Sequence, residues 1–184
     1  MLPTSEINKK SIALLIIGII FISSTLRAPL TAVGPIISYI RDGLDISNVL
    51  AGFITTIPLL AFAVISPFAP RVARRFGMEM TLFLAILLLA FGIAIRSTGT
   101  PFFLLFGTAL IGIAIAFGNV LIPSFIKLKF PLQIGLLTGI FTVSMNLSAG
   151  IGAGISYPIA EGSFLGWQGA LGIWSILAII ACLV

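Results

Sequence analysis

One arginine lies inside the first long apolar stretch of the chain, where charge is rare. Arg27 is about 15 residues, or roughly 22 Å of helix, from the N-terminal end of that stretch. At that depth in a bilayer a guanidinium is costly, and such residues commonly face a cavity or a partner. Its planar fork of donors suits a small anion such as a carboxylate or cyanate. Three interpretations of Arg27 are open. It lines a substrate cavity, it contacts a part of the protein that this sequence lacks, or it anchors the helix by snorkelling to the membrane surface.

Polar or small residues recur around Arg27 at helical spacing. Successive intervals of 4, 4, 3 and 4 residues place them on one face of an otherwise apolar helix. The members of this stripe are Ser23, Arg27, Thr31, Gly34 and Ser38. Thr31 lies one turn beyond Arg27 and is therefore the second candidate for contact with a bound solute.

Two asparagines in later apolar stretches are the next candidates. Asn119 and Asn146 carry amides that need hydrogen-bond partners, and lipid offers none. Thr138 and Thr142 precede Asn146 at intervals of four residues, so the three side chains share one helix face. Each asparagine either lines a cavity or bonds to a neighbouring helix, an interaction commonly worth about 0.6–2 kcal/mol in membranes. The nearby Gly150, Gly152 and Gly154 are expected at a close helix contact.

The composition excludes most soluble classes of protein. Of 184 residues, 59% are hydrophobic and 8% are charged, whereas a soluble domain carries roughly 25% charged residues. The chain has no histidine and one cysteine, so a histidine-based metal site, a histidine general base and a disulfide framework are excluded. The sequence contains no phosphate-binding loop and no clustered basic face for nucleic acid. We therefore predict a membrane protein that is not an enzyme, without cofactor, metal or nucleic-acid partner.

Six apolar stretches are long enough, or nearly so, to cross a bilayer core of about 30 Å as helices. They cover residues 11–39, 47–68, 78–95, 101–124, 132–157 and 167–184. Helices are expected because an open strand edge in lipid leaves backbone groups unpaired. The predicted fold class is thus an all-α integral membrane domain of six transmembrane helices over residues 1–184. Gly34-Pro35 is expected to bend the first helix.

Loop charges predict how these helices are oriented. Seven bases fall on one side of the membrane and two, Arg41 and Arg96, on the other. The seven are Lys9, Lys10, Arg71, Arg74, Arg75, Lys127 and Lys129. Cytoplasmic loops carry the excess of Lys and Arg, so the N-terminus is expected in the cytoplasm of a cell whose plasma membrane holds the protein.

A repeat relates the two halves of the sequence. A shift of 87 residues places residues 51–56 on 138–143, and a shift of 88 places Pro35 on Pro123. Each copy would hold three spans, so the second copy must be inverted in the membrane. We expect a 3+3 inverted repeat. The last stretch, about 27 Å of helix, ends without a Lys or Arg flank, and we expect the sequence to be part of a larger protein.

The residues around Arg27 also carry a family resemblance. They read Thr25-Leu26-Arg27-Ala28-Pro29-Leu30-Thr31-Ala32-Val33-Gly34-Pro35. This segment resembles the first-span motif of the cyanate-permease and 2-nitroimidazole-transporter branch of the major facilitator superfamily, roughly L-R-P-A-L-T-S-V-G-P. Residues 118–123, 135–139 and 146–147 are similar to later parts of that branch. The resemblance covers essentially the whole chain. It implies the N-terminal six-helix half of a twelve-helix transporter, with the C-terminal half absent.

One loop departs from the family pattern. The superfamily motif between the second and third spans reads about G-x-L-A-D-R-x-G-R-[RK]. Here Arg75 and Gly77 are kept, Arg74 replaces the Asp, and Met78-Glu79 replace the terminal basic pair. We expect Arg71, Arg74, Arg75 and Gly77 to form a gating loop whose usual charge pair cannot form in the usual way.

The resemblance implies transport of a small anionic or polar solute, cyanate-like or a small organic anion, by alternating access. Arg27 would bind the solute, with Thr31, Asn119 and Asn146 nearby. The expected partners are the solute, the lipid bilayer and a second six-helix half, which is either the missing C-terminal half or another copy. The alternative is a membrane protein that transports nothing, as a truncated product or an interaction subunit.

Overall fold

The computed structural model describes the backbone of residues 9–183 and the side chains of residues 16–182. All regular structure in this part is helical, as expected, and no strand occurs in it. The elements are α1 (Lys9–Thr31), η1 (Gly34–Ile36), α2 (Ile37–Leu44), α3 (Asn48–Ile65), α4 (Ala69–Phe76), α5 (Met78–Arg96), α6 (Pro101–Lys129), η2 (Pro131–Gln133), α7 (Ile134–Gly162) and α8 (Gly166–Leu183). The side chains of Lys9 and Lys10, used above for orientation, lie outside the described residues.

Five apolar segments are long enough to cross a membrane. They are Ile16–Leu44, Asn48–Ile65, Met78–Arg96, Pro101–Lys129 and Pro131–Gly162. The sixth expected stretch forms a shorter apolar helix, Gly166–Cys182. The structure thus supports five spanning helices by length and composition, and the sixth helix only reaches the lower end of the usual range.

The first apolar stretch is not one continuous helix. Helix α1 ends at Thr31, a turn follows, and η1 leads into α2. The break coincides with Gly34-Pro35, where proline has no amide hydrogen to continue the helical ladder. Helix α2 then ends at Leu44, beyond the predicted limit of residue 39.

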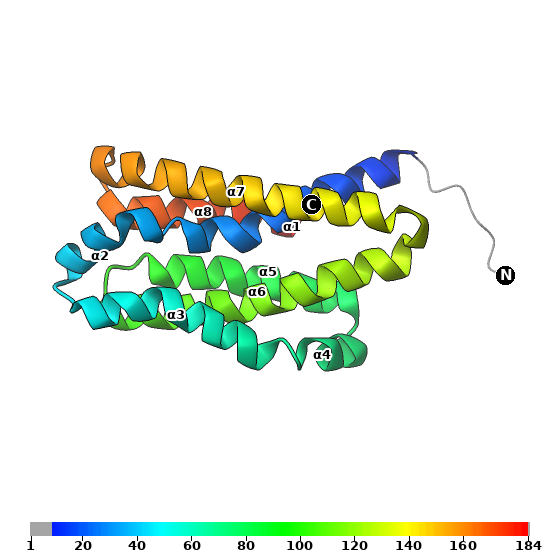
Figure 1. The fold of residues 1–184 in the computed structure, drawn as a ribbon, viewed down its shortest axis with the longest axis horizontal. Helices are drawn as coiled ribbons and strands as arrows, with labels where there is room; N and C mark the ends of the chain where they lie inside the picture. Colours follow the sequence, from blue (N-terminus) through cyan, green and yellow to red (C-terminus); the bar gives the residue numbers. More distant parts are fainter. Residues whose placement is uncertain (1–8, 184) are drawn as a thin grey trace.

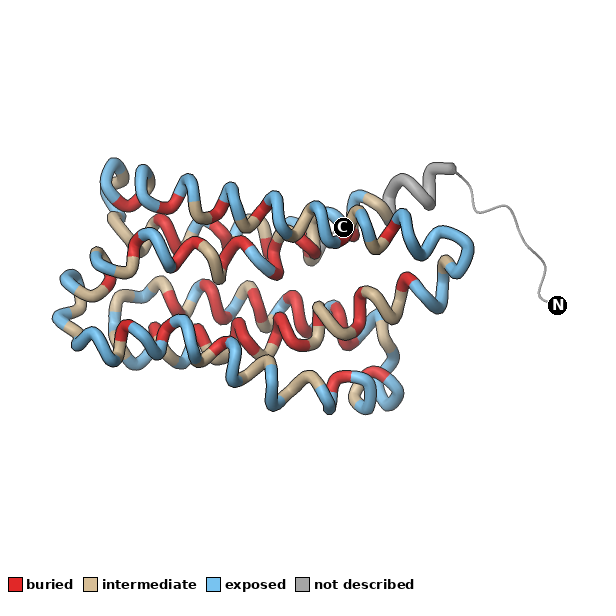
Figure 2. Tube along the Cα trace, in the orientation of Figure 1, coloured by how far each residue is buried: buried red, intermediate tan, exposed pale blue. Residues whose placement is uncertain are grey.

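The long helices lie side by side in one bundle (Figure 1). Helix α1 packs along α7 and α8, α6 packs along α5 and α3, and α5 packs on α8. The N-terminal end of α1, helix α4 and the turn between α6 and α7 lie at one end, and α2 lies at the other. Helix α6 is the most buried, whereas α3 and α7 are mostly exposed (Figure 2).

Glycines allow the backbones to approach at the main helix crossings. A Cβ atom on Gly112 of α6 would lie 2.6 Å from the Pro58 Cα in α3. A Cβ atom on Gly152 of α7 would lie 2.9 Å from the Ala28 carbonyl oxygen in α1. The expectation of close packing is wrong for Gly150 and Gly154, because both have open space around them. Only one of these three successive small positions on α7 can face α1 in a helix of 3.6 residues per turn.

Candidate functional site

Arg27 lies on the open side of α1. Its side chain is exposed, while its neighbours Leu26 and Ala28 are buried in the bundle. It sits near the middle of the apolar segment Ile16–Leu44. No carboxylate among the described side chains lies within 4.0 Å of its guanidinium. The donors of Arg27 are therefore available to a group outside this bundle.

Helices α1 and α6 make a close contact next to Arg27 and Asn119 in the chain. Leu26 meets Gly118 so closely that a Cβ atom on Gly118 would lie 2.5 Å from the Leu26 Cδ2. Arg27 and Asn119 directly follow these two contact residues in the chain. Asn119 is half-buried.

The packing of α1 on α7 adds Thr31 and Asn146. The Thr31 hydroxyl donates to the Ala149 carbonyl oxygen at 3.0 Å. Arg27 precedes Thr31 by one turn of α1, and Asn146 precedes Ala149 by about one turn of α7. The two helices run in the same direction (Figure 1). Arg27 and Asn146 are both exposed, and both therefore lie on the N-terminal side of the contact between Thr31 and Ala149 along the two helices.

Asn146 is held partly by its own helix. Its Nδ2 donates to the Thr142 carbonyl oxygen at 2.9 Å, and the Thr142 hydroxyl donates to the Thr138 carbonyl oxygen at 2.9 Å. These are bonds within α7, not bonds to a neighbouring helix. These bonds position the Asn146 side-chain amide, and its oxygen takes part in neither of them.

The four candidate residues come from three helices that contact one another, α1, α6 and α7. Arg27 supplies a charged fork of donors, the two amides supply donors and acceptors, and Thr31 links α1 to α7. Such a set can hold a small planar anion or a polar group with two acceptor oxygens. These groups offer hydrogen bonds and one positive charge to a bound group.

Arg96 is not the loop base that the sequence predicts. It is the last residue of α5 and is 0% exposed. Its Nη1 donates to the Pro29 carbonyl oxygen of α1 at 2.9 Å. Its Nε and Nη2 are buried without a hydrogen-bond partner among the described residues. An arginine at the end of an apolar stretch can be a loop residue or a buried residue of the helix. No local feature of the sequence distinguishes these two environments.

The break in α1 explains why Pro29 can accept this bond. In a continuous helix the Val33 amide would donate to Pro29, four residues earlier. Here the Val33 amide donates to Leu30 instead, at 3.4 Å. The Pro29 carbonyl is left free inside the bundle, and a buried free carbonyl is costly. Arg96 supplies the donor, so it fixes the end of the helix that carries Arg27.

The expected gating loop is largely a helix. Arg71, Arg74 and Arg75 lie on α4, where all three are exposed. Gly77 joins α4 to α5 with φ +88°, a conformation in which L side chains are strained. Helix α4 lies at one end of the bundle (Figure 1), whereas Arg27 lies near the middle of the apolar segment Ile16–Leu44. The structure therefore does not bring the two sets of predicted residues together.

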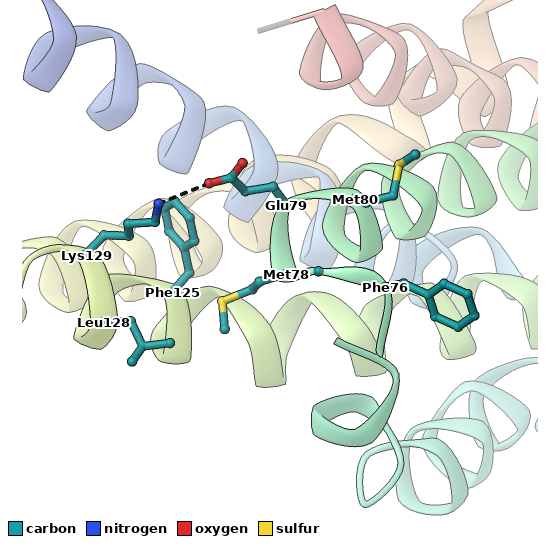
Figure 3. A pocket seen from close by; sticks show the side chains of 8 residues that line it. Phe76, Met78, Glu79, Met80, Phe125, Leu128 and Lys129 are labelled. Atoms are coloured by element: carbon teal, nitrogen blue, oxygen red, sulfur yellow. Dashed lines mark ion pairs between the residues drawn. The ribbon is translucent and has the colours of Figure 1, made fainter. Parts of the chain in front are cut away.

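A cavity of about 420 Å³ lies at the same end, between the start of α5 and the end of α6. Its lining includes Phe76, Met78, Phe125 and Leu128 (Figure 3). Lys129 Nζ and Glu79 Oε1 form an ion pair across it at 3.3 Å. The pair is exposed, so it contributes little to stability.

Comparison with known proteins gives the family. Residues 13–184 match the Major Facilitator Superfamily. The chain is 49% identical over 170 residues to the uncharacterized transporter YycB of Bacillus subtilis, covering 92% of the chain and 42% of that protein. It is 46% identical over 171 residues to the 2-nitroimidazole transporter of Escherichia coli, covering 93% of the chain and 43% of that protein. It is 24% identical over 168 residues to the cyanate transport protein CynX of Escherichia coli, covering 91% and 44%.

The chain therefore spans less than half the length of these curated relatives. The match nevertheless covers nearly all of the chain, and several helices are apolar enough to cross a membrane. The resemblance inferred from the segment around Arg27 is confirmed. The chain is a multi-pass membrane protein of the Major Facilitator Superfamily, similar to the N-terminal half of its 2-nitroimidazole and cyanate transporters.

Proposed function

We propose that this chain forms one half of a secondary transporter for a small anionic or polar solute. Arg27 binds the solute, and Thr31, Asn119 and Asn146 complete its side of the site. The observation that carries the proposal is the exposed guanidinium of Arg27 in the middle of an apolar segment. A charge there is costly in lipid, so a solute or an aqueous cavity must face it.

The chemistry of the site favours a planar group with two acceptor atoms. A guanidinium offers two parallel donors, and a carboxylate or a nitro group offers two oxygens in one plane. Two relatives are named as transporters of 2-nitroimidazole and of cyanate. Both solutes are small, and each presents acceptor atoms to such a fork. We infer a cyanate-like or small organic anion, or a nitro-substituted ring, as the solute class.

Transport requires a second half to close the site. The partner is a further six-helix half, either from the remainder of a longer chain or from another copy. The solute then binds near the bilayer midplane between the halves, and access alternates by rocking. The exposed face with Arg27 and Asn146 is the side that would meet the second half.

The arrangement of helices in the membrane is part of the proposal. Helix α1 pairs with α7 and α6 pairs with α3, which is the pairing that a 3+3 inverted repeat of α1, α3, α5 and α6, α7, α8 would produce. The N-terminus lies in the cytoplasm and the protein lies in the plasma membrane. Arg41 and Arg96 were the two bases expected on the side of the membrane opposite the N-terminus. Because Arg96 is buried, only Arg41 remains exposed there, and the excess of bases on the N-terminal side is larger.

Uptake of labelled 2-nitroimidazole and cyanate into proteoliposomes tests the proposal. The protein is this chain, alone and joined to the remaining part of the Escherichia coli 2-nitroimidazole transporter. We expect saturable uptake by the joined protein, at least tenfold lower with Arg27→Gln and unchanged with Arg41→Gln. Uptake by the chain alone would identify a second copy as the partner half. Uptake that is insensitive to Arg27→Gln would contradict the proposed site.

A further inference from the structure

A second hollow in the bundle is an apolar groove that runs from α4 along α5. It has a volume of about 240 Å³. Val72 and Phe76 of α4 line one end, Leu84 and Leu88 of α5 line its length, and Phe117 of α6 closes one side. The part along α5 from residue 81 to residue 88 is about 10 Å long at 1.5 Å per residue. The groove is thus elongated along the helices.

The lining of this groove is almost entirely apolar. Thr81 is the one residue with a polar side chain in the lining. Its hydroxyl donates to the Gly77 carbonyl oxygen at 2.6 Å, so its hydrogen is used within the helix. A polar solute would find few partners in the groove, whereas an acyl chain would bury apolar surface there.

The α4 end of the groove carries positive charge. The Arg75 guanidinium lies 5.4 Å from the centre of the Phe76 ring, and that ring lines the groove. Arg71 precedes Arg75 by four residues and therefore lies on the same side of α4. Arg74 is two residues from Val72, about 200° around the helix, and points away from the groove.

These arginines have no acidic partner nearby. In the part of the chain with described side chains, ion pairs join Arg41 to Asp42 and Lys129 to Glu79. No carboxylate lies within 4.0 Å of Arg71, Arg74 or Arg75 there. The acidic residue that the superfamily motif places in this segment is Arg74 in this chain. The groove end therefore suits an anion that comes from outside the bundle.

We propose that the groove is a binding site for an anionic phospholipid. One acyl chain lies along Leu84 and Leu88, and the headgroup phosphate binds Arg75 and Arg71. An anion and a long apolar chain occur together in such a lipid, and basic segments at a membrane surface attract anionic headgroups. Guanidinium groups also bind phosphate through paired hydrogen bonds. This site is separate from Arg27 and does not rest on the proposed transport.

Native mass spectrometry of the purified chain with phosphatidylglycerol and phosphatidylcholine tests this site. We expect the chain to bind phosphatidylglycerol at least tenfold more tightly than phosphatidylcholine. Arg75→Gln should weaken phosphatidylglycerol binding about fivefold, which corresponds to about 1 kcal/mol for one base near an anionic surface. It should leave phosphatidylcholine binding unchanged. Arg75→Lys, which keeps the charge, should stay within about twofold of the original chain.

Matched variants separate the groove from a general charge effect. Leu84→Trp fills the groove and should weaken the binding of both lipids, whereas Leu87→Trp on a neighbouring face of α5 should not. Arg74→Gln, on the far side of α4, should change phosphatidylglycerol binding less than twofold. Equal binding of the two lipids, or an equal loss with Arg74→Gln and Arg75→Gln, would overturn the proposal. Since Arg75 is exposed, its variants test the proposal even where Leu84→Trp fails to fold.

Discussion

Arg27 and Arg96 are both arginines of apolar helices, yet their surroundings differ. Arg27 is exposed and faces out of the bundle, so its cost in lipid is removed only by something that covers it. Arg96 is fully buried and bonded to the Pro29 carbonyl. The donors of Arg27 therefore face out of the bundle, whereas Arg96 bonds to the end of the helix that carries Arg27.

Replacing Arg96 tests its role at the end of α1. Arg96→Met keeps the volume but removes the one donor to the Pro29 carbonyl, which costs about 1–3 kcal/mol for a buried acceptor. We expect a lower melting temperature in detergent than for the original chain, and no change for the exposed Arg41→Met. A melting temperature equal to or above that of the original chain would mean that burying Nε and Nη2 costs more than the bond contributes.

The contact between α1 and α7 sets the spacing of Arg27 and Asn146. Gly152 lets the backbones meet beside Thr31, and the Thr31 hydroxyl then reaches the Ala149 carbonyl. Any side chain at residue 152 must push α1 away from α7. The spacing of Arg27 and Asn146 therefore depends on a residue that touches neither of them.

This dependence predicts different effects for two nearby glycines. Gly152→Val should destabilise the bundle by about 1–3 kcal/mol through overpacking, and it should lower solute affinity in the joined protein. Gly154→Val has open space and should change stability by less than about 0.5 kcal/mol. Thermal unfolding of both variants measures the difference. Equal melting temperatures would contradict the close contact at Gly152.

Elements with a strong local signal are predictable from the sequence. Helix α5 covers residues 78–96 against a prediction of 78–95, because its apolar length is a local property. Helix α4 was missed, since its eight residues include three arginines and a proline and read as a loop, and the helix is supported by packing on α5 and α6. The burial of Arg96 was also missed, because it depends on residues of other helices, such as Pro29 and Gly107.

The candidate residues were chosen from the sequence by type, because polar groups are rare in these apolar stretches. Their role in binding stays a prediction. The helix contacts beside them were not deducible, namely Leu26 with Gly118 and Thr31 with Ala149. Both contacts join residues far apart in the chain, and no local pattern encodes them.

At the scale of the whole molecule, the orientation in the membrane can be tested at two exposed turns. Leu132 lies at the turn between α6 and α7, and Phe164 lies between α7 and α8 at the other end. In a Cys182→Ser background, Leu132→Cys and Phe164→Cys each provide a single thiol. A membrane-impermeant maleimide on intact cells should label only Phe164→Cys, and Leu132→Cys only after permeabilisation. The reverse pattern would place the N-terminus outside.

Helices α3 and α7 are mostly exposed, and they lie at opposite edges of the bundle in the view of Figure 2. Large apolar residues such as Phe53, Val143 and Leu147 are exposed on these helices. Lipid can cover apolar side chains, but it cannot satisfy Arg27 or Asn146. Under the proposed function, the second half covers Arg27 and Asn146, and the solute lies between the two halves.

Equilibrium binding of labelled 2-nitroimidazole to the joined protein in nanodiscs tests the central role of Arg27 most directly. A charge-assisted pair of hydrogen bonds is worth about 1.5–3 kcal/mol, which corresponds to roughly 10- to 150-fold in affinity. We predict that Arg27→Gln weakens binding by at least tenfold, while Arg41→Gln leaves it unchanged. Equal affinities for Arg27→Gln and the original protein would contradict the assignment of Arg27 as the residue that binds the solute.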